Sequence, residues 1–225
     1  MAKHILIIGA SRGIGLGLAQ EFAKRGWQVT ASERERSDDL HDAADGSDDA
    51  ITVTTIDVTD PASYEGLDLA PGSLDAIIVN AGITGAKHQS ADQATGDEVA
   101  HVMMTNAFGP IRAARALLPK IKEGGVLGLM SSKMGSIDDS SGGYELYRTS
   151  KVAQNMLAKG VFEQDAKPRD IAVLSLHPGW VQTDMGGPNA TLTIEESVSG
   201  LADVVENQSQ PEYRFVEYSG KELAF

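Results

Sequence analysis

The chain has 225 residues, 41% of them hydrophobic, which is enough for one large α/β domain or two small ones with a sizeable core. Its formal net charge of −13 argues against nucleic acid or an anionic membrane surface as a partner, because both would repel it. The absence of cysteine excludes a disulfide framework, a thiol nucleophile and a cysteine-ligated zinc site.

Short apolar runs alternate with longer amphipathic stretches, a pattern that predicts a parallel sheet flanked by helices. The expected strands are residues 4–8, 28–32, 51–56, 74–80, 125–131, 171–177 and 214–218. The expected helices are residues 14–25, 92–118 and 144–166, with a further helix after residue 193. The sequence therefore predicts an α/β fold of the Rossmann type, doubly wound, with a mostly parallel sheet of about seven strands.

Two segments are predicted to be irregular. Residues 33–49 carry eight acidic side chains and little apolar content, which favours a solvated loop. Residues 185–193 are rich in glycine and include a proline, which is typical of a flexible loop. Because no linker or repeat divides the chain, we expect a single domain over residues 1–225, with a small substrate lid near residues 185–200. No apolar run is long enough for a membrane span or a signal-peptide core, so we expect a cytoplasmic protein without a membrane partner.

A glycine-rich turn joins the first expected strand to the first expected helix. Gly9, Gly13 and Gly15 have the spacing Gly-x-x-x-Gly-x-Gly, which differs from the commonest dinucleotide fingerprint and from a P-loop. Glycines let the backbone turn tightly and let a phosphate approach it, and the exposed amides of the helix N-terminus favour an anion. The alternative is a plain strand-to-helix turn.

Tyr147 and Lys151 are four residues apart, so both side chains share one face of a helix. A positive charge beside a phenol stabilises the phenolate, which makes the phenol a plausible proton donor near neutral pH. Taken alone, the pair proves little, because such a spacing is more often a helix-surface contact. The five histidines are scattered without a ligand spacing, so no metal site is expected, and His177 at a strand end is interpreted as structural.

Several motifs together resemble those of the short-chain dehydrogenases/reductases, and they cover almost the whole chain. Within this family the chain resembles the branch of compact carbonyl reductases that includes the sniffer and C-factor proteins, on the segments 131–136, 177–185 and 219–223. The motifs, in chain order, are Gly9 to Gly15, Asp57-Val58, Asn80-Ala81-Gly82, Asn106, Ser131-Ser132, Tyr147 with Lys151, and Pro178-Gly179 with Thr183.

The resemblance implies reversible hydride transfer between a nicotinamide and a carbonyl or alcohol. Tyr147 would be the general acid or base, and Lys151 would lower its pKa and hold the nicotinamide ribose. Ser132 would stabilise charge on the substrate oxygen, and Asn106 would orient a water that relays protons through Lys151. Ser131 and Ser136 are rivals of Ser132, since its spacing from Tyr147 is slightly longer than usual in the family. Tyr144 is a weaker rival of Tyr147, because Arg148 stands where its lysine would be.

The cofactor contacts implied by the resemblance fall at the carboxyl ends of the expected strands, where an open α/β sheet binds its ligand. Asp57 and the Val58 amide would bind adenine, and Val181 and Thr183 would hold the nicotinamide carboxamide. Each has an alternative as an ordinary turn or capping residue. The full set of cofactor-binding candidates is Gly9, Ser11, Arg12, Gly13, Ile14, Gly15, Arg34, Asp57, Val58, Asn80, Ala81, Gly82, Tyr147, Lys151, Pro178, Gly179, Val181 and Thr183.

The cofactor choice depends on three charges. Arg12 and Arg34 are placed like the family's binders of the adenosine 2′-phosphate, which arginine engages by forked, charge-assisted bonds. Glu33 stands where NAD-preferring members carry an acid that repels this phosphate. Two cations against one anion favour NADP(H), with NAD(H) as the alternative.

The predicted function is therefore that of an NADP(H)-preferring carbonyl reductase or alcohol dehydrogenase acting on a small molecule. A homo-oligomer through the long central helices is also implied by the resemblance. The alternatives are a catalytically silent nucleotide-binding or signalling protein of the C-factor type, and another Rossmann enzyme such as a methyltransferase. Neither alternative requires the phenol of Tyr147.

Overall fold

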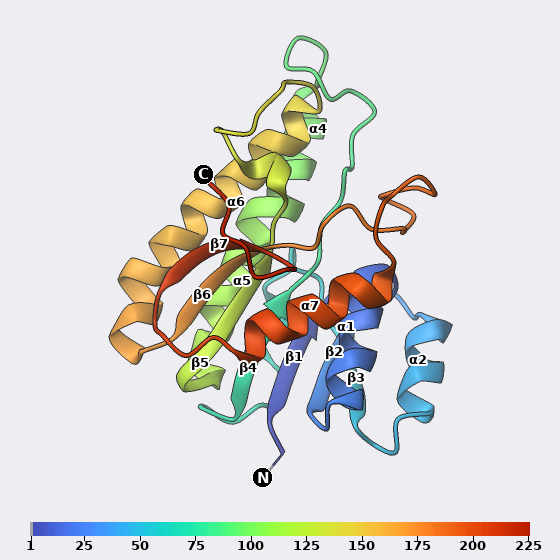
Figure 1. Ribbon diagram of the computed structural model, residues 1–225, viewed down its shortest axis with the longest axis vertical. Coiled ribbons are helices and arrows are strands. Elements are labelled where there is room, and N and C mark those ends of the chain that lie inside the picture. The colour runs from blue at the N-terminus through green and yellow to red at the C-terminus, as the bar shows by residue number, and fades with distance from the viewer. Residues whose placement is uncertain (1) are drawn as a thin grey trace.

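Seven parallel strands form the centre of the protein, as the computed structural model of residues 2–225 shows (Figure 1). Their order in the sheet is β3-β2-β1-β4-β5-β6-β7, and every neighbouring pair is parallel. The strands are β1 (His4–Ile8), β2 (Gln28–Glu33), β3 (Ile51–Thr55), β4 (Leu74–Val79), β5 (Ile121–Met130), β6 (Ala172–His177) and β7 (Tyr213–Glu217). The strand order reverses between β1 and β4, which makes the carboxyl ends of these strands the expected ligand site. The predicted fold class is confirmed, with a wholly parallel sheet.

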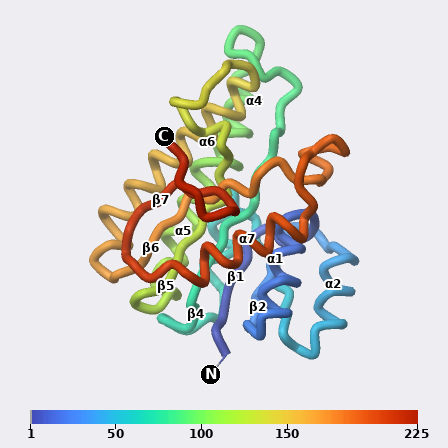
Figure 2. The backbone as a smooth tube through the Cα atoms, in the orientation of Figure 1, coloured from blue at the N-terminus to red at the C-terminus, as the bar shows by residue number. Residues whose placement is uncertain are grey.

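Helices cover both faces of this sheet (Figures 1 and 2). One face carries α1, α2 and α7, and the opposite face carries α5 and α6. The α-helices are α1 (Gly13–Lys24), α2 (Asp38–Asp45), α3 (Ala62–Glu65), α4 (Gly96–Met103), α5 (Gly109–Leu117), α6 (Glu145–Val161) and α7 (Ile194–Glu206). A membrane-spanning helix would have to be longer or more apolar than any helix formed by residues 2–225.

The central strand β1 shows why the sheet is buried on both faces. Ile5 and Ile7 belong to the core cluster under α1 and α7, whereas Leu6 and Ile8 belong to the cluster under α5 and α6. All four side chains are fully buried. Because successive strand residues point to opposite faces, an unbroken apolar run is what a strand between two helical layers requires.

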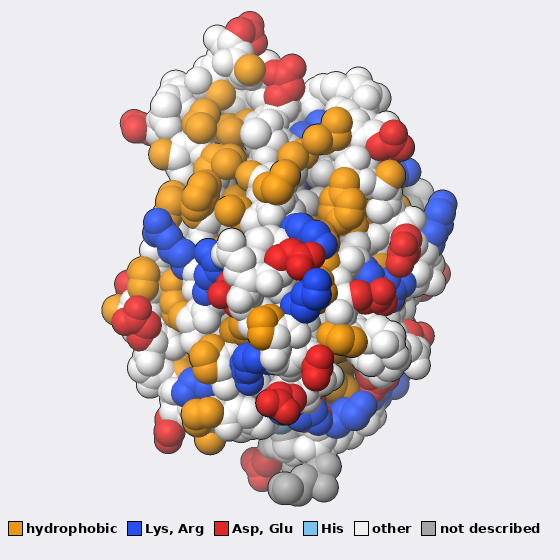
Figure 3. Space-filling model, turned by 90° about the vertical axis from the view of Figure 1, so that its left-hand side faces the viewer, with side chains coloured by type: hydrophobic (Ala, Val, Ile, Leu, Met, Phe, Trp, Pro, Cys, Tyr) orange, Lys and Arg blue, Asp and Glu red, His pale blue; other side chains and the backbone are white. Residues whose placement is uncertain are grey.

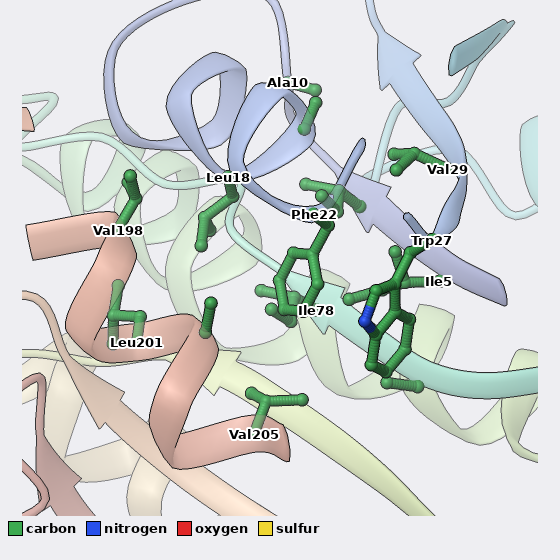
Figure 4. Packing of buried hydrophobic residues seen from close by; sticks show 14 of the residues in the cluster. Ile5, Ala10, Leu18, Phe22, Trp27, Val29, Ile78, Val198, Leu201 and Val205 are labelled. Atoms are coloured by element: carbon green, nitrogen blue, oxygen red, sulfur yellow. The ribbon is translucent and has the colours of Figure 1, made fainter. Parts of the chain in front are cut away.

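The contact between α1 and α7 fixes the helix that follows the glycine-rich turn (Figure 4). Leu18 and Phe22 of α1 lie in the same cluster as Leu201 of α7, all of them fully buried. The helices approach closely at Gly17, where a Cβ would lie 2.5 Å from the Ile194 side chain. The packing of α7 against α1 therefore also fixes the position of the turn at the N-terminus of α1.

The prediction of a loop over residues 33–49 is wrong, because this segment contains α2. The Ser37 hydroxyl caps α2 by accepting a hydrogen bond from the Leu40 amide at 3.3 Å. Two aspartates in the first turn suit the positive end of the helix dipole, and Leu40 is fully buried in the core. The acidic composition favoured a loop, although the segment forms a short helix with one buried side. The Ser37 hydroxyl also donates to the Ser11 carbonyl at 2.6 Å, so α2 is tied to the glycine-rich turn.

The predicted helix over residues 92–118 is interrupted. It begins only at Gly96, after a capping box in which Thr95 and Glu98 satisfy each other's backbone amides. A π-helical turn, η1 (Met104–Phe108), then separates α4 from α5. The wider turn occurs at Asn106, one of the candidate site residues, and such turns are frequent at functional sites.

The other predicted boundaries hold to within a residue, apart from two, and part of the predicted lid is helix. β5 begins at Ile121 rather than residue 125, with a register irregularity opposite β4. α6 ends at Val161 and continues as a π-helical turn to residue 166. α7 begins at Ile194 and buries Ser197 and Val198. The segment 194–200 of the predicted lid is thus packed helix, and the loop proper is residues 185–193.

Candidate active site

The glycines of the glycine-rich turn pack directly against other backbone, where a side chain would collide. A Cβ on Gly15 would lie 2.0 Å from the Gly9 carbonyl oxygen, and a Cβ on Gly9 would lie 2.9 Å from the Ala81 backbone. Gly9 and Gly13 have φ values of 87° and 56°, which favour glycine. No side chain caps α1, and its first turn carries no acid, so its N-terminal amides are suited to an anion. The turn therefore fits the diphosphate of a dinucleotide.

The segment after β4 packs directly against this turn. The Asn80 side-chain amide donates to the Gly9 carbonyl at 2.8 Å, and the Asn80 and Ala81 amides both donate to the Ile8 carbonyl. Gly82 lies beside the two candidate catalytic groups, since a Cβ there would lie 3.4 Å from both Lys151 Nζ and Asn106 Oδ1. The structure thus brings the predicted Asn80-Ala81-Gly82 motif between the phosphate turn and the reaction centre.

At the adenosine end, both carboxylate oxygens of the acid that argued for NAD are bonded within the protein. Glu33 is 7% exposed, and its two carboxylate oxygens accept from the Ser37 amide at 2.7 Å and from His41 Nε2 at 3.0 Å. These bonds outweigh burial and lower the pKa of Glu33. Arg12 and Arg34 are instead exposed, with only solvent-exposed partners, Asp184 and Glu35 respectively.

Asp57 has the turn role that was left open as its alternative. Its Oδ1 accepts from the Thr59 amide at 2.8 Å and from the Thr59 hydroxyl at 2.7 Å. These bonds, with the charge of Arg34, lower the pKa of Asp57 against the opposing effect of burial. The second carboxylate oxygen has no protein partner among the described residues, so the turn role and an adenine contact are compatible.

Tyr147, Lys151 and Ser132 come together in the interior. Tyr147 and Lys151 lie on the buried face of α6, and Lys151 Nζ is 5.9 Å from the centre of the Tyr147 ring. Ser132 follows the end of β5; its hydroxyl accepts from the Met134 amide at 3.2 Å and is close enough to the Tyr147 phenol to lower the pKa of that phenol. Tyr144, the rival phenol, is 59% exposed in the N-cap position of α6, and the Ser131 hydroxyl is committed to Asn155 at 2.7 Å.

Burial shifts both candidate proton-transfer groups toward their neutral forms. Burial raises the pKa of Tyr147 above its ordinary value, against a smaller lowering by Ser132. Burial lowers the pKa of Lys151 to about 7. The sequence predicted a lowered phenol pKa, and that prediction is wrong for the protein alone, since burial outweighs the lowering by Ser132.

Asn106 is held by its own side chain. Its Oδ1 accepts from the Ile83 amide at 2.8 Å, and its Nδ2 donates to the Ile83 carbonyl at 2.7 Å and to Ser150 Oγ at 3.0 Å. The two amide hydrogens are therefore used by the segment after β4 and by Ser150 of α6. Asn106 therefore makes structural hydrogen bonds, and a water relay would have to use the remaining acceptor capacity of its Oδ1.

The segment after β6 returns to the glycine-rich turn. The Thr183 methyl group lies near Gly13, where a Cβ would be 3.4 Å away, and the next residue, Asp184, pairs with Arg12 at 3.1 Å. The Thr183 hydroxyl accepts from the Gly186 amide at 3.1 Å, which is the capping role left open for it. The loop 183–190 therefore starts at the candidate phosphate site and is closed by the pairing of Val181 with Leu192.

Two residues of the site were missed by the sequence analysis. Gln154 is fully buried, one turn after Lys151. Lys151 Nζ donates to Gln154 Oε1 at 3.3 Å and to the Met130 carbonyl at 2.8 Å. Gln89 accepts from the Tyr147 amide at 3.1 Å and so supports the start of α6. The spacing of three between Lys151 and Gln154 was a visible signal, because it puts both on one helix face.

Comparison with known proteins gives the class. A sequence profile described as short chain dehydrogenase matches residues 3–191, and the chain belongs to this family. The predicted family and its oxidoreductase class are thereby confirmed.

The individual relatives agree with the predicted branch. The C-signal of Myxococcus xanthus is 39% identical over 157 residues, which cover 68% of this chain and 93% of that protein. A carbonyl reductase from Pseudomonas aeruginosa PAO1, crystallised in complex with NADP, is 39% identical with a TM-score of 0.91, and each chain covers all of the other. The carbonyl reductase Sniffer of D. melanogaster is 31% identical with a TM-score of 0.86, again with full coverage of both chains.

Proposed function

We propose that the protein is an NADP(H)-dependent carbonyl reductase or alcohol dehydrogenase that acts on a small molecule, with its one sheet forming a single cofactor-binding domain. The observation that carries this proposal is the burial of Tyr147, Lys151 and Ser132 together at the sheet edge where the glycine-rich turn presents the N-terminal amides of α1. A silent nucleotide-binding or signalling protein is not favoured, because binding alone does not require a buried phenol and amine. A bound nicotinamide would supply the hydride that reduces the carbonyl.

The chain's own residues would move the proton and stabilise the charge. In reduction the Tyr147 phenol donates its proton to the carbonyl oxygen, and in oxidation the phenolate accepts it. Ser132 donates a hydrogen bond to the same oxygen. The raised pKa of Tyr147 keeps the phenol protonated at neutral pH, which suits the reductive direction. Lys151 holds the nicotinamide ribose, and Asn106 fixes the backbone at Ile83 beside it.

The direct test is NADPH consumption with purified protein and a panel of aldehydes, diketones, quinones and keto esters. NADP⁺ reduction with the corresponding alcohols tests the reverse direction. Turnover of at least one of these classes is expected. Failure of every carbonyl and every alcohol to support turnover would show that the proposed activity is wrong.

We also propose that Arg12 and Arg34 bind the adenosine 2′-phosphate, since NADP occupies the Pseudomonas relative and Glu33 is bonded inside the protein. Arg12→Ala and Arg34→Ala are each expected to raise the KM for NADPH by about 10-fold or more, because each removes charge-assisted bonds. The KM for NADH, which lacks this phosphate, should change little.

Steady-state kinetics with both cofactors would check this. Arg115→Ala is the control, since Arg115 of α5 forms a surface ion pair with Asp165. Equal effects of Arg34→Ala on NADPH and NADH would contradict the phosphate assignment.

A homo-oligomer and a cytoplasmic location stay predictions. Figure 3 views the molecule from the side of α6 and shows hydrophobic side chains over the upper half of this face. α6 itself exposes 72% of Met156, which is compatible with association through this helix. Size-exclusion chromatography with light scattering would determine the oligomeric state.

A further inference from the structure

A hollow of about 350 Å³ opens beside the candidate catalytic serine. Ser132 lines it from the end of β5, Arg148 from the first turn of α6, and Trp180 from the segment after β6. A molecule that fills this hollow can therefore place one end at Ser132 and another group at Arg148.

Arg148 has the environment of an anion-binding residue. Its Nε donates to the Gly143 carbonyl at 2.9 Å, and its Nη1 lies at 3.4 Å from the Met134 carbonyl. Within residues 2–225 it forms no ion pair with a carboxylate, and its Nη2 makes no hydrogen bond. The guanidinium is thus half-buried and anchored by backbone, and its remaining donors are unused. A fixed fork of this kind suits the paired oxygens of a carboxylate or phosphate.

The other charges around the hollow cancel. Lys133 pairs with Asp139 at 3.3 Å, so the two contribute little net charge. His177 also lines the hollow, and burial lowers its pKa to about 4, so it is neutral at pH 7. Among the residues that line the hollow, Arg148 is therefore the charged group without an oppositely charged partner. The exposed indole of Trp180, held by a bond from Nε1 to the Gly186 carbonyl at 2.9 Å, provides an apolar wall.

We propose that the preferred substrates are aldehydes or ketones that also carry an anionic oxygen group, with the carbonyl at Ser132 and the anionic group bound by Arg148. This inference rests on the proposed function and specifies its substrate class. The apolar body between the two groups packs on Trp180.

The test compares para-substituted benzaldehydes that differ in charge but little in size. The readout is the kcat/KM for 4-formylbenzoate divided by that for the neutral 4-formylbenzamide, with NADPH as cofactor. 4-Formylphenyl phosphate forms a second arm, which distinguishes a phosphate from a carboxylate as the preferred group. We expect a ratio of about 10 or more for an anionic substrate over the amide, since a hydrogen-bonded charge pair is worth that factor.

Two variants link this ratio to Arg148. In Arg148→Met the ratio should fall toward 1, and because both substrates are measured on the same variant, any general loss of activity cancels. In Asp139→Asn, which frees Lys133 of its partner, the ratio should rise. Arg115→Met, which removes an arginine from the outer side of the helices, is the matched control and should keep the wild-type ratio.

Binding gives a readout that does not depend on turnover. Benzoate, but not benzamide, should change the fluorescence of Trp180, and Arg148→Met should abolish the difference. A wild-type ratio of 1 or below, or an unchanged ratio in Arg148→Met, overturns the inference while leaving the reductase intact. If no carbonyl and no alcohol is turned over, the proposed function fails, and equal binding of benzoate and benzamide would then overturn the substrate class as well.

Discussion

Tyr147→Phe should reduce kcat for carbonyl reduction by about 10²- to 10⁴-fold, the usual contribution of a positioned general acid. The change removes one oxygen from a side chain that is 8% exposed, so the packing around it is retained. Because the phenol would act on the substrate oxygen, the dissociation constant of NADPH should change little. Stopped-flow measurement of a single turnover and fluorescence titration of NADPH separate these two effects.

The structure offers a matched control on the same helix. Tyr144→Phe removes the same atom from an exposed residue at the N-cap of α6 and should keep wild-type activity. If Tyr144→Phe lost the activity and Tyr147→Phe kept it, the choice between the two phenols would be reversed. Similar activity in wild type and Tyr147→Phe would contradict the acid–base assignment.

Lys151→Met should abolish most of the activity and also change how the stability of the cofactor-free protein depends on pH. Burial lowers the pKa of Lys151 from 10.5 to about 7. Between these values the unfolded chain binds a proton that the folded chain does not, so the free energy of unfolding rises with pH. Stability from this group is highest above pH 10.5 and is lost as the pH falls through about 7. The slope for one proton is about 1.4 kcal/mol per pH unit at most.

Urea unfolding between about pH 7.5 and 9.5 measures this slope. Other shifted groups titrate outside the window: burial lowers the pKa of His177 to about 4 and raises that of Tyr213 to about 12. Tyr147 is the only titratable side chain seen in contact with Lys151 among the described residues, and its raised pKa lies above the window too. Lys151→Met should flatten the slope. Lys159→Met should keep it, because Lys159 is exposed and pairs with Glu163, four residues further along the chain. Equal slopes in wild type and Lys151→Met would show that the amine is charged in the folded protein.

The strands were predictable because each is an apolar run with the length of a strand, and β1 is apolar on both faces. The glycine-rich turn and the position of Tyr147 relative to Lys151 were also readable, because backbone sterics and helix spacing act over a few residues. These local rules placed the candidate residues at one edge of the sheet.

Properties that depend on distant packing were not readable. α2 was missed because its stability comes from the Ser37 cap and from the burial of Leu40, both of which require the rest of the fold. The direction of the Tyr147 pKa shift was wrong because the depth of burial is not written in the spacing. The amide of Asn106 is used by Ile83 and Ser150, which lie 23 and 44 residues away in the chain.

The inward-facing Glu33 bears on how the cofactor preference could be changed by design. Removing the arginines alone would weaken NADPH binding without creating a partner for the ribose of NADH, because the carboxylate that could serve is already bonded to Ser37 and His41. Releasing it requires changes in α2, whose cap residue Ser37 is bonded to the turn that would hold the cofactor. We therefore expect a reversal of coenzyme preference when a substitution of His41 is combined with Arg34→Ala. Substitutions in the glycine-rich turn alone should not produce it.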